Sequence, residues 1–249
     1  LDITGEITVL ESAYRRDADA RAAGVVLLPG VGFDVVPTDC LAALLAAALP
    51  TATHLELGFA AGGGLSPGTF ATSLRGMAAG NLRRVDGKLV GIPMGGPSRE
   101  VPLPSGTRTL TAIPWGDLAS AYRSTGIPNI TVYTRVARSG APARLAAGAL
   151  RLPGVASLTR RLASPAGPDA ARRARTRCEV WGEVRDAAGG SRTATLTGPN
   201  GYSLTADSAL RAVLRVLAGG VPPGAHTPAT ALTPDFVREL DGVAVSPVS

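Results

Sequence analysis

The pattern of hydrophobic and polar positions predicts an α–β–α order at the start of the chain. In residues 7–23 apolar side chains recur at helical spacing, which predicts a helix that Gly24 ends. The unbroken apolar run of residues 25–29 is typical of a strand covered on both faces. After a glycine turn, Pro37 suits the first position of a helix over residues 37–49, because its missing N–H would have no partner there. This order is typical of the last part of a doubly wound sheet.

From residue 50 onward the pattern changes to short strands with fewer helices. Residues 54–59 alternate between apolar and polar side chains, as a half-buried strand does. Two later alternating runs, joined by a turn over residues 186–191, predict an antiparallel hairpin. The remaining predicted strands cover residues 82–92, 99–103, 106–113 and 129–137, and the remaining predicted helices cover residues 69–79, 115–124, 203–218 and a short segment that ends near Leu240.

The predicted helix over residues 203–218 has a clear apolar stripe, which we expect to face the core. The side chains of this stripe are Leu204, Ala209, Leu210, Val213, Leu214 and Leu217.

These elements predict a fold of the α/β plus α+β class with two domains. Residues 1–50, with residues 231–249 docking back onto them, are expected to form part of a Rossmann-type nucleotide-binding domain. Residues 51–230 are expected to form an α+β domain with a mixed or antiparallel sheet, which binds substrate or forms a homodimer.

Composition limits the classes of protein that fit. The chain has 249 residues, of which 45% are hydrophobic, so it can bury a sizeable core. No apolar run reaches the roughly 20 residues that a membrane-spanning helix needs. Cys40 and Cys178 lie far apart, which favours two reduced thiols in the cytoplasm and gives no ligand spacing for a structural metal.

Positive charge is concentrated in one segment. The net charge is +6, and the segment from residue 138 to residue 177 contains nine arginines and one acidic residue, Asp169. Such a segment can attract an acidic carrier protein or a lipid surface, although a solvated arginine face is the simpler interpretation. Aromatic residues are not interleaved with the arginines, so nucleic-acid binding has little support. The nine residues are Arg138, Arg144, Arg151, Arg160, Arg161, Arg172, Arg173, Arg175 and Arg177.

The turn after the first predicted strand is the main candidate for cofactor binding. Gly30, Gly32, Phe33 and Asp34 resemble half of a dinucleotide fingerprint, but its third glycine is missing. The turn is therefore weak as a primary cofactor motif and stronger as a second wall of a cofactor site. A tight crossover turn is the simpler interpretation.

Two polar segments next to predicted helices have functional and structural interpretations. Thr4 and Glu6, on either side of Gly5, are candidates to lie beside a nicotinamide, whereas Glu6 could also cap the following helix. Ser66 and Thr69 follow a run of glycines and could hold an anion or a substrate carbonyl, or act as N-caps.

The other candidate residues lie in turn-rich segments. Trp115 and Tyr122 could line an apolar acyl pocket or pack in the core, and Asn129 closes a turn before a predicted strand. Tyr202, at a predicted helix start, is a weak candidate proton donor. The Gly-x-Ser-x-Gly motif of hydrolases is absent.

Several blocks together resemble the saccharopine dehydrogenase-like oxidoreductases, in particular an actinobacterial branch that includes trans-acting enoyl reductases. The block Gly-Phe-Asp-x-x-Pro-x-Asp is the most specific of them. The blocks are residues 4–6, 28–39, 66–69, 113–117, 124–129 and 224–228, in family order along nearly the whole chain.

The resemblance implies a further segment. Members of the family begin with a Rossmann half that carries a glycine fingerprint for NADP, whereas this sequence starts where that half would join the Thr-Gly-Glu turn. We therefore expect the NADP site to be incomplete in these 249 residues.

The function implied by the resemblance is hydride transfer from NADPH to a C=C or C=N bond of an acyl, polyketide-type or other small-molecule substrate, which a carrier protein could present. It places Thr4, Gly5, Glu6, Gly30, Gly32, Phe33 and Asp34 beside the cofactor, and Ser66, Thr69, Trp115, Asn129 and Tyr202 towards the substrate. The alternative is a non-catalytic scaffold that docks an acidic carrier protein or a lipid surface through its arginines.

Overall fold

The computed structural model describes residues 1–64, 66, 68, 80–93, 95–135, 149, 154–155 and 167–249. Thr69 and the rest of the predicted helix over residues 69–79 lie outside the described residues. Five arginines of the basic segment also lie outside them: Arg138, Arg144, Arg151, Arg160 and Arg161.

The chain begins with two short helices, which replace the predicted helix over residues 7–23. They are α1 (Ile7–Arg15) and α2 (Asp17–Ala22), and they meet at Arg16. Gly24 ends α2 in the left-handed region, with φ of +66°, where glycine has no steric cost. The predicted helical region and its end at Gly24 are therefore correct, but two helices that meet at Arg16 form it instead of one.

The strand predicted over residues 25–29 shortens to β1 (Val26–Leu27). It pairs in parallel with β10 (Gly224–Ala225) to form a two-stranded sheet. The prediction that this run is covered on both faces is wrong at its start, because Val25 is 47% exposed. A parallel pair of this kind is normally part of a larger, covered sheet. The predicted helix over residues 37–49 forms as α3 (Val36–Ala48), with Pro37 in its first turn.

The larger sheet of the described residues combines parallel and antiparallel strands. Its main path runs in the order β11-β9-β8-β2-β7-β3-β4, and β6 joins β7 from the side and pairs with β5. β2 and β7 are parallel, whereas the other pairs are antiparallel. The bounds are β2 (Ala52–Ala61), β3 (Asn81–Val85), β4 (Lys88–Ile92), β5 (Ser98–Leu103), β6 (Gly106–Ala112), β7 (Asn129–Thr134), β8 (Arg177–Asp186), β9 (Ser191–Pro199) and β11 (Ala244–Val245).

The predicted fold class, which joins α/β and α+β features around a mixed sheet, is confirmed. The predicted β8–β9 hairpin forms, and residues 82–92 form the hairpin of β3 and β4. The division of the chain into two domains stays a prediction.

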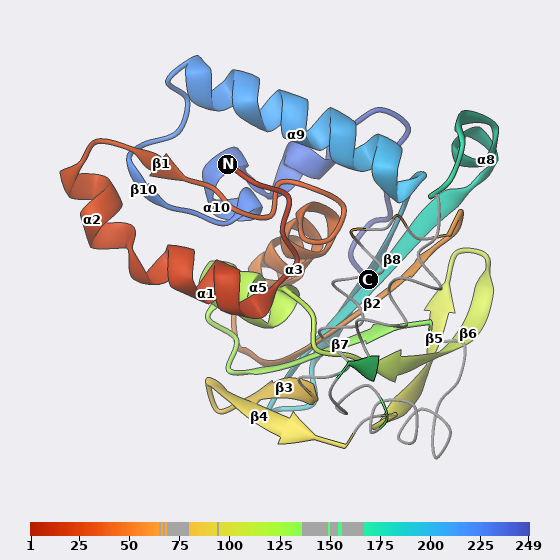
Figure 1. Cartoon of the computed structure of the whole chain (residues 1–249). Helices are drawn as coiled ribbons and strands as arrows, with labels where there is room; N and C mark the ends of the chain where they lie inside the picture. The colour runs from red at the N-terminus through yellow and green to blue at the C-terminus, as the bar shows by residue number, and fades with distance from the viewer. Residues whose placement is uncertain are drawn as a thin grey trace.

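Helices cover one face of the larger sheet (Figure 1). α3 packs on β8, β9 and β2, and α5 (Asp117–Thr125) packs on α3 and β7. α10 (Pro228–Leu232) and the 3₁₀ helix η1 (Pro234–Glu239) lie against α3. A separate apolar cluster joins the β5–β6 hairpin to the sheet through Val101, Leu110 and Trp181. α8 (Ala170–Arg175) precedes β8 and has no buried residue.

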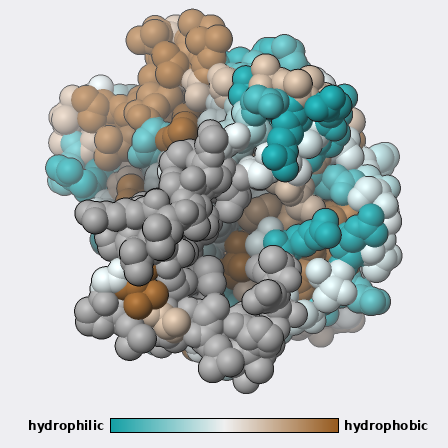
Figure 2. Space-filling model, turned by 45° about the vertical axis from the view of Figure 1, so that its right-hand side comes forward, coloured by the Kyte–Doolittle hydropathy of each residue, from teal (hydrophilic) through white to brown (hydrophobic). Residues whose placement is uncertain are grey.

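The long helix α9 (Gly201–Leu217) runs along the top of the molecule in Figure 1. Its buried residues are Leu204, Ser208 and Ala212. The prediction that its apolar stripe faces the core is wrong for four residues, Leu210, Val213, Leu214 and Leu217, which are 60%, 38%, 57% and 78% exposed. Figure 2 shows hydrophobic side chains gathered over α9 at the top of the molecule. The reason is that the side of α9 with the smaller Ser208 and Ala212 faces the protein and lets the helix approach closely. None of the described helices is long and apolar enough to span a bilayer.

Candidate functional site

The segment before α1 is held against the loop that follows β1. The carboxylate of Asp2 accepts hydrogen bonds from the backbone N–H groups of Thr4 (2.9 Å) and Gly30 (3.1 Å). The backbone carbonyl of Asp2 accepts the N–H of Val31 at 2.9 Å. In the same segment the Thr4 hydroxyl accepts the N–H of Glu6 at 3.2 Å. Asp2 therefore fixes residues 2–6 beside the loop over residues 30–34, at the carboxyl end of β1.

The two glycines of that loop allow close packing within the chain. Gly30 has φ of +73°, and a Cβ placed on it would lie 2.9 Å from Cγ2 of Val35. A Cβ on Gly32 would lie 2.9 Å from Cγ2 of Thr205 in α9. The turn thus needs glycine for its own conformation and for contact with α9. These contacts agree with the simpler interpretation of the glycines as a tight crossover turn.

Phe33 lies where the loop, α9 and two aromatic side chains meet. Its backbone N–H donates to Oγ1 of Thr205 at 2.9 Å, and its ring packs on Gly201 at the start of α9. The ring of Phe33 meets that of Phe59 edge-on at 5.9 Å, and Phe59 meets Trp115 at 5.4 Å. The three rings support the loop from β2 and from the start of α5.

Asp34 is the titratable group of this loop. Trp115 donates its Nε1–H to the backbone carbonyl of Asp34 at 3.0 Å, while a Cβ on Gly5 would lie 3.1 Å from Cβ of Asp34. Burial raises the pKa of the Asp34 carboxyl to about 6. As a residue Asp34 is half-buried, and its carboxyl ionises near neutral pH.

Two further carboxyl groups lie beneath the loop. Burial raises the pKa of Asp117 well above its usual range, a hydrogen bond with Thr38 opposes this rise, and the nearby Asp39 and Asp34 add to it. Burial also raises the pKa of Asp39, against hydrogen bonds from Ser124 (2.7 Å) and from the Ala229 N–H (2.8 Å). Both groups are fully buried, so they hold α3, α5 and α10 together rather than meeting a ligand.

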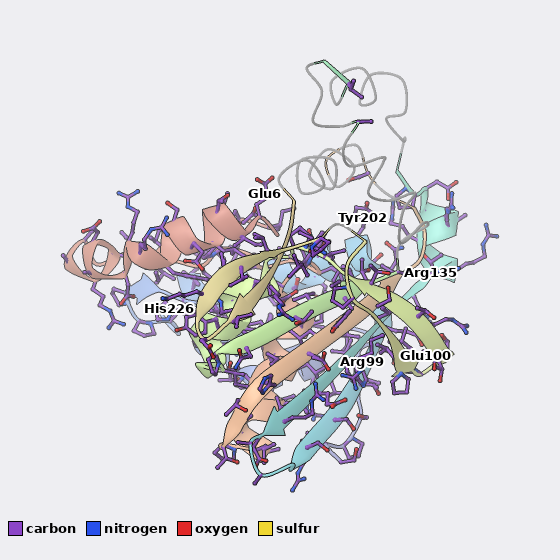
Figure 3. The ribbon with its side chains drawn as sticks, turned by 90° about the horizontal axis from the view of Figure 1, so that it is seen from below. Glu6, Arg99, Glu100, Arg135, Tyr202 and His226 are labelled. Atoms are coloured by element: carbon purple, nitrogen blue, oxygen red, sulfur yellow. The ribbon has the colours of Figure 1, made fainter. Side chains whose placement is uncertain are left out.

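The start of α9 also borders a cavity. Tyr202 accepts the backbone N–H of Ser66 at its hydroxyl, which brings together two residues predicted from separate motifs. Both line a cavity of about 730 Å³ whose walls come from α9, from Ser66 and from the segment before β8. Glu6 and Tyr202 lie along the same edge of the molecule in Figure 3, away from Arg99 on β5. Glu6 is the N-cap residue of α1 but makes no side-chain capping hydrogen bond.

Two residues predicted near the substrate have other surroundings. Asn129, at the start of β7, donates to the carbonyl of Thr53 and accepts the N–H of Asp86, both at 3.0 Å. It is five residues along β7 from the position paired with Phe59, which is roughly 17 Å away along the strand. Tyr122 packs under the guanidinium of Arg84, 4.2 Å from its ring centre. The structure does not bring these two side chains to the loop over residues 30–34.

Sequence reasoning missed Asp2, Phe59, Gly116 and Thr205. Asp2 and Thr4 carry the signal of a turn in which an aspartate accepts an N–H two residues later. A Cβ on Gly116 would lie 2.9 Å from the carbonyl oxygen of Gly5, a contact between segments far apart in sequence. Nothing local distinguishes Thr205 from other polar residues of an amphipathic helix. Among the described residues, no three His, Cys, Asp or Glu side chains are grouped to hold a metal ion.

Comparisons with known proteins place this arrangement in a known fold. No family model matches the sequence, and no curated protein matches it. A solved structure of apo saccharopine dehydrogenase (L-Glu forming) from Saccharomyces cerevisiae matches with a TM-score of 0.51. The chain has a saccharopine dehydrogenase-like fold. The match covers 94% of this chain and 77% of the yeast chain at 12% identity, so the likeness is one of fold.

Proposed function

We propose that this chain supplies the substrate side and one nicotinamide wall of an NADPH-dependent oxidoreductase that reduces a C=C or C=N bond. The observation that carries the proposal is the contact between residues 4–6 and the loop over residues 30–34 at the carboxyl end of β1. Crevices outside the carboxyl ends of parallel strands are where open α/β folds bind nucleotides. The saccharopine dehydrogenase-like fold supports a dehydrogenase-like activity by analogy.

The residues of this wall fit a nicotinamide better than the rest of a dinucleotide. Thr4, Gly5, Glu6, Phe33 and Asp34 are all partly exposed and offer backbone groups, a phenyl ring and carboxyl oxygens. None of the five is basic, so they offer no cation for the phosphates of NADP. The proposal therefore assigns the phosphates to a further polypeptide segment that continues the sheet from β1, which pairs with β10 alone among the described strands.

In hydride transfer the protein contributes mainly by orienting the nicotinamide and the substrate. The reduced nicotinamide supplies the hydride when it is bound. Phe33 and the backbone of Gly5 would hold the ring plane, since both are fixed by packing against α9 and α5. The Asp34 carboxyl, with a pKa of about 6, is largely ionised at pH 7 and would favour positive charge on the oxidised ring.

The proposed substrate side is the cavity next to the start of α9. Tyr202 and Ser66 line it, and the Phe33 ring contacts Gly201, one residue before Tyr202. Trp115 supports Asp34 from behind through its hydrogen bond rather than by lining this cavity. The substrate would therefore reach the nicotinamide wall from the α9 side.

The test is binding of NADPH, followed by its fluorescence at high protein concentration, together with hydride transfer to candidate enoyl and imine substrates. Gly32→Ala should weaken binding strongly, because its new Cβ would push Thr205 and α9 away from the loop. Gly91→Ala is the matched control, since a Cβ there meets nothing within 4 Å. Absence of NADPH binding in a protein extended by the segment that holds the phosphates, or equal weakening by both substitutions, would contradict the proposal.

A further inference from the structure

The start of α5 contacts both halves of the proposed nicotinamide wall. Trp115 donates its Nε1–H to the Asp34 carbonyl at 3.0 Å and so reaches the loop over residues 30–34. A Cβ on the next residue, Gly116, would lie 2.9 Å from the carbonyl oxygen of Gly5, so the segment before α1 packs directly on α5. The position of α5 therefore sets how the two halves of the wall lie relative to each other.

Asp117, the first residue of α5, ties the helix to the loop by a further route. Its Oδ1 is hydrogen-bonded to the hydroxyl of Thr38 in the first turn of α3. The same hydroxyl lies 3.0 Å from the backbone carbonyl oxygen of Val35, the residue that follows Asp34. Asp117 is thus linked through Thr38 to the end of the loop.

The two bonds of the Thr38 hydroxyl indicate which group supplies the second proton. A hydroxyl has one hydrogen, and the carbonyl of Val35 can only accept one. Both bonds form only if Thr38 donates to Val35 and accepts a proton from the Asp117 carboxyl. An ionised carboxylate could take the hydroxyl hydrogen for itself, but the Val35 contact would then hold no hydrogen bond. A neutral carboxylic acid at Asp117 satisfies both contacts.

The surroundings of Asp117 favour the same state. The residue is fully buried, and its Oδ2 has no hydrogen-bond partner in the part of the chain that the structure describes. The titratable groups that face it are Asp39 of α3, Asp34 of the loop and the buried Tyr14 of α1, none of which is a cation. Burial raises the pKa of Asp117 well above its usual range, and Asp39 and Asp34 add to the rise. A buried carboxylate without a cation is costly, so the group keeps its proton.

The arginines around α5 are paired with other carboxylates. Arg84, which donates to the Leu118 carbonyl of α5, pairs with Glu11 at 2.6 Å. Arg123 lies 3.5 Å from Asp17. Neither arginine is therefore left to neutralise a carboxylate at the start of α5.

We propose that Asp117 is a positioning residue of the nicotinamide wall and works as a neutral carboxylic acid, which donates its proton to Thr38 and so fixes α5 against the loop over residues 30–34. The positioning role rests on the proposed function, whereas the neutral state follows from the hydrogen bonds and the burial alone. A neutral Asp117 places no charge beneath the wall, so Asp34 ionises without repulsion from it.

The first experiment is urea unfolding of the wild type and of Asp117→Asn from pH 5 to pH 8. The unfolded wild type is ionised at Asp117 above about pH 4, so it must bind a proton to fold, and its stability falls as pH rises. Asparagine can donate the same hydrogen bond without binding a proton. The folding equilibrium constant of Asp117→Asn relative to the wild type should therefore rise by up to about tenfold per pH unit.

The control is Asp235→Asn, at a surface ion pair with Arg238, and its ratio to the wild type should stay constant over the same range. A ratio for Asp117→Asn that also stays constant, or that falls as pH rises, would overturn the neutral state.

Carbon-13 NMR of the aspartate carboxyl groups observes the proton more directly. The Asp117 signal should not titrate between pH 5 and pH 8, and the Asp34 signal should titrate with the same midpoint in the wild type and in Asp117→Asn. A lower Asp34 midpoint in Asp117→Asn would mean that Asp117 carries a negative charge in the wild type, and would overturn the proposal.

Asp117→Leu tests the positioning role, because leucine is of similar size and makes no hydrogen bond. In a ¹H–¹⁵N NMR titration with NADP⁺, the shifts of the Gly5 and Asp34 amides should fall in Asp117→Leu and persist in Asp117→Asn. Equal shifts in the two variants would overturn the role. If Asp117→Leu is unfolded, Thr38→Val compared with Thr38→Ser makes the same test from the other side of the hydrogen bond.

The two parts of the proposal fail separately. A wild type in which NADP⁺ shifts none of these amides would overturn the proposed function and, with it, the positioning role of Asp117. The unfolding and carboxyl measurements would still decide whether Asp117 is neutral, because they need no cofactor.

Discussion

Replacing Asp34 with asparagine tests whether burial against Gly5 and Trp115 sets the properties of this carboxyl. Burial raises its pKa from 3.8 to about 6, so the folded protein binds this proton more tightly than the unfolded chain does. By linkage, the contribution of Asp34 to stability falls as pH rises from about 4 to about 6 and is constant above that range. At pH 7 the ionised Asp34 carboxylate therefore destabilises the folded wild type, and asparagine removes this destabilisation.

The size of the effect follows from the pKa. A change from 3.8 to about 6, at about 1.4 kcal/mol per pKa unit, gives about 3 kcal/mol as an upper limit. The side chain is partly exposed, so solvent screening reduces the measured value. Because asparagine cannot ionise, the free energy of unfolding of Asp34→Asn relative to the wild type should increase between pH 4.5 and pH 7, by about 1–2 kcal/mol.

The assay is urea unfolding of both proteins at several pH values. Differences between variant and wild type cancel the carboxyl groups that Asp34 does not influence, including Asp17 and Asp186, whose pKa values are lowered mainly by backbone and side-chain hydrogen bonds, respectively. Asp235→Asn is the control, because Asp235 pairs with Arg238 on the surface. A stability difference that stays the same from pH 4.5 to pH 7, or that runs in the opposite direction, would refute the reasoning.

Three further variants test neighbouring parts of the account. Asp39→Asn turns an amide N–H₂ towards either the Ser124 hydroxyl or the Ala229 N–H. Thermal unfolding should therefore show a loss of about 1–3 kcal/mol in the free energy of unfolding. Unchanged stability would contradict the role of this buried hydrogen-bond network. Trp115→Phe removes the hydrogen bond to the Asp34 carbonyl and should cost about 1 kcal/mol in urea unfolding; no loss would mean that the indole N–H does not hold the loop. If α8 docks an acidic carrier protein, the triple change of Arg172, Arg173 and Arg175 to alanine should weaken salt-sensitive binding of an acyl carrier protein in fluorescence titrations. Binding that is insensitive to salt or to these changes would exclude α8 as the docking surface.

Local patterns predicted most of the elements, because each depends on neighbouring residues. The alternation in residues 179–185 and 192–197 and the turn between them were enough for the β8–β9 hairpin. Pro37 marked the start of α3, and Gly24 the end of α2. The pairing partners of β1 could not be predicted, since β10 lies nearly 200 residues later in the chain.

The limits of sequence reasoning are clearest in α9 and at the candidate site. Hydrophobic periodicity shows that a helix has an apolar stripe, but in α9 the side with Ser208 and Ala212 faces the protein and Leu214 faces outwards. Gly32 was predicted from its motif, whereas its partner Thr205 was not, because their contact joins segments 173 residues apart. Asn129 was placed towards the substrate by the family resemblance, and in the structure its amide joins β7 to Thr53 and Asp86.

The most direct test of the central claim is a ¹H–¹⁵N NMR titration of the chain with NADP⁺, which detects binding even at millimolar affinity. If residues 4–6 and the loop over residues 30–34 form a nicotinamide wall, the largest shifts should fall on the amides of Gly5, Glu6, Phe33 and Asp34, and Asp34→Asn should reduce them. Saturating NADP⁺ that leaves these amides unshifted, or that shifts only a distant surface such as β4, would contradict the account.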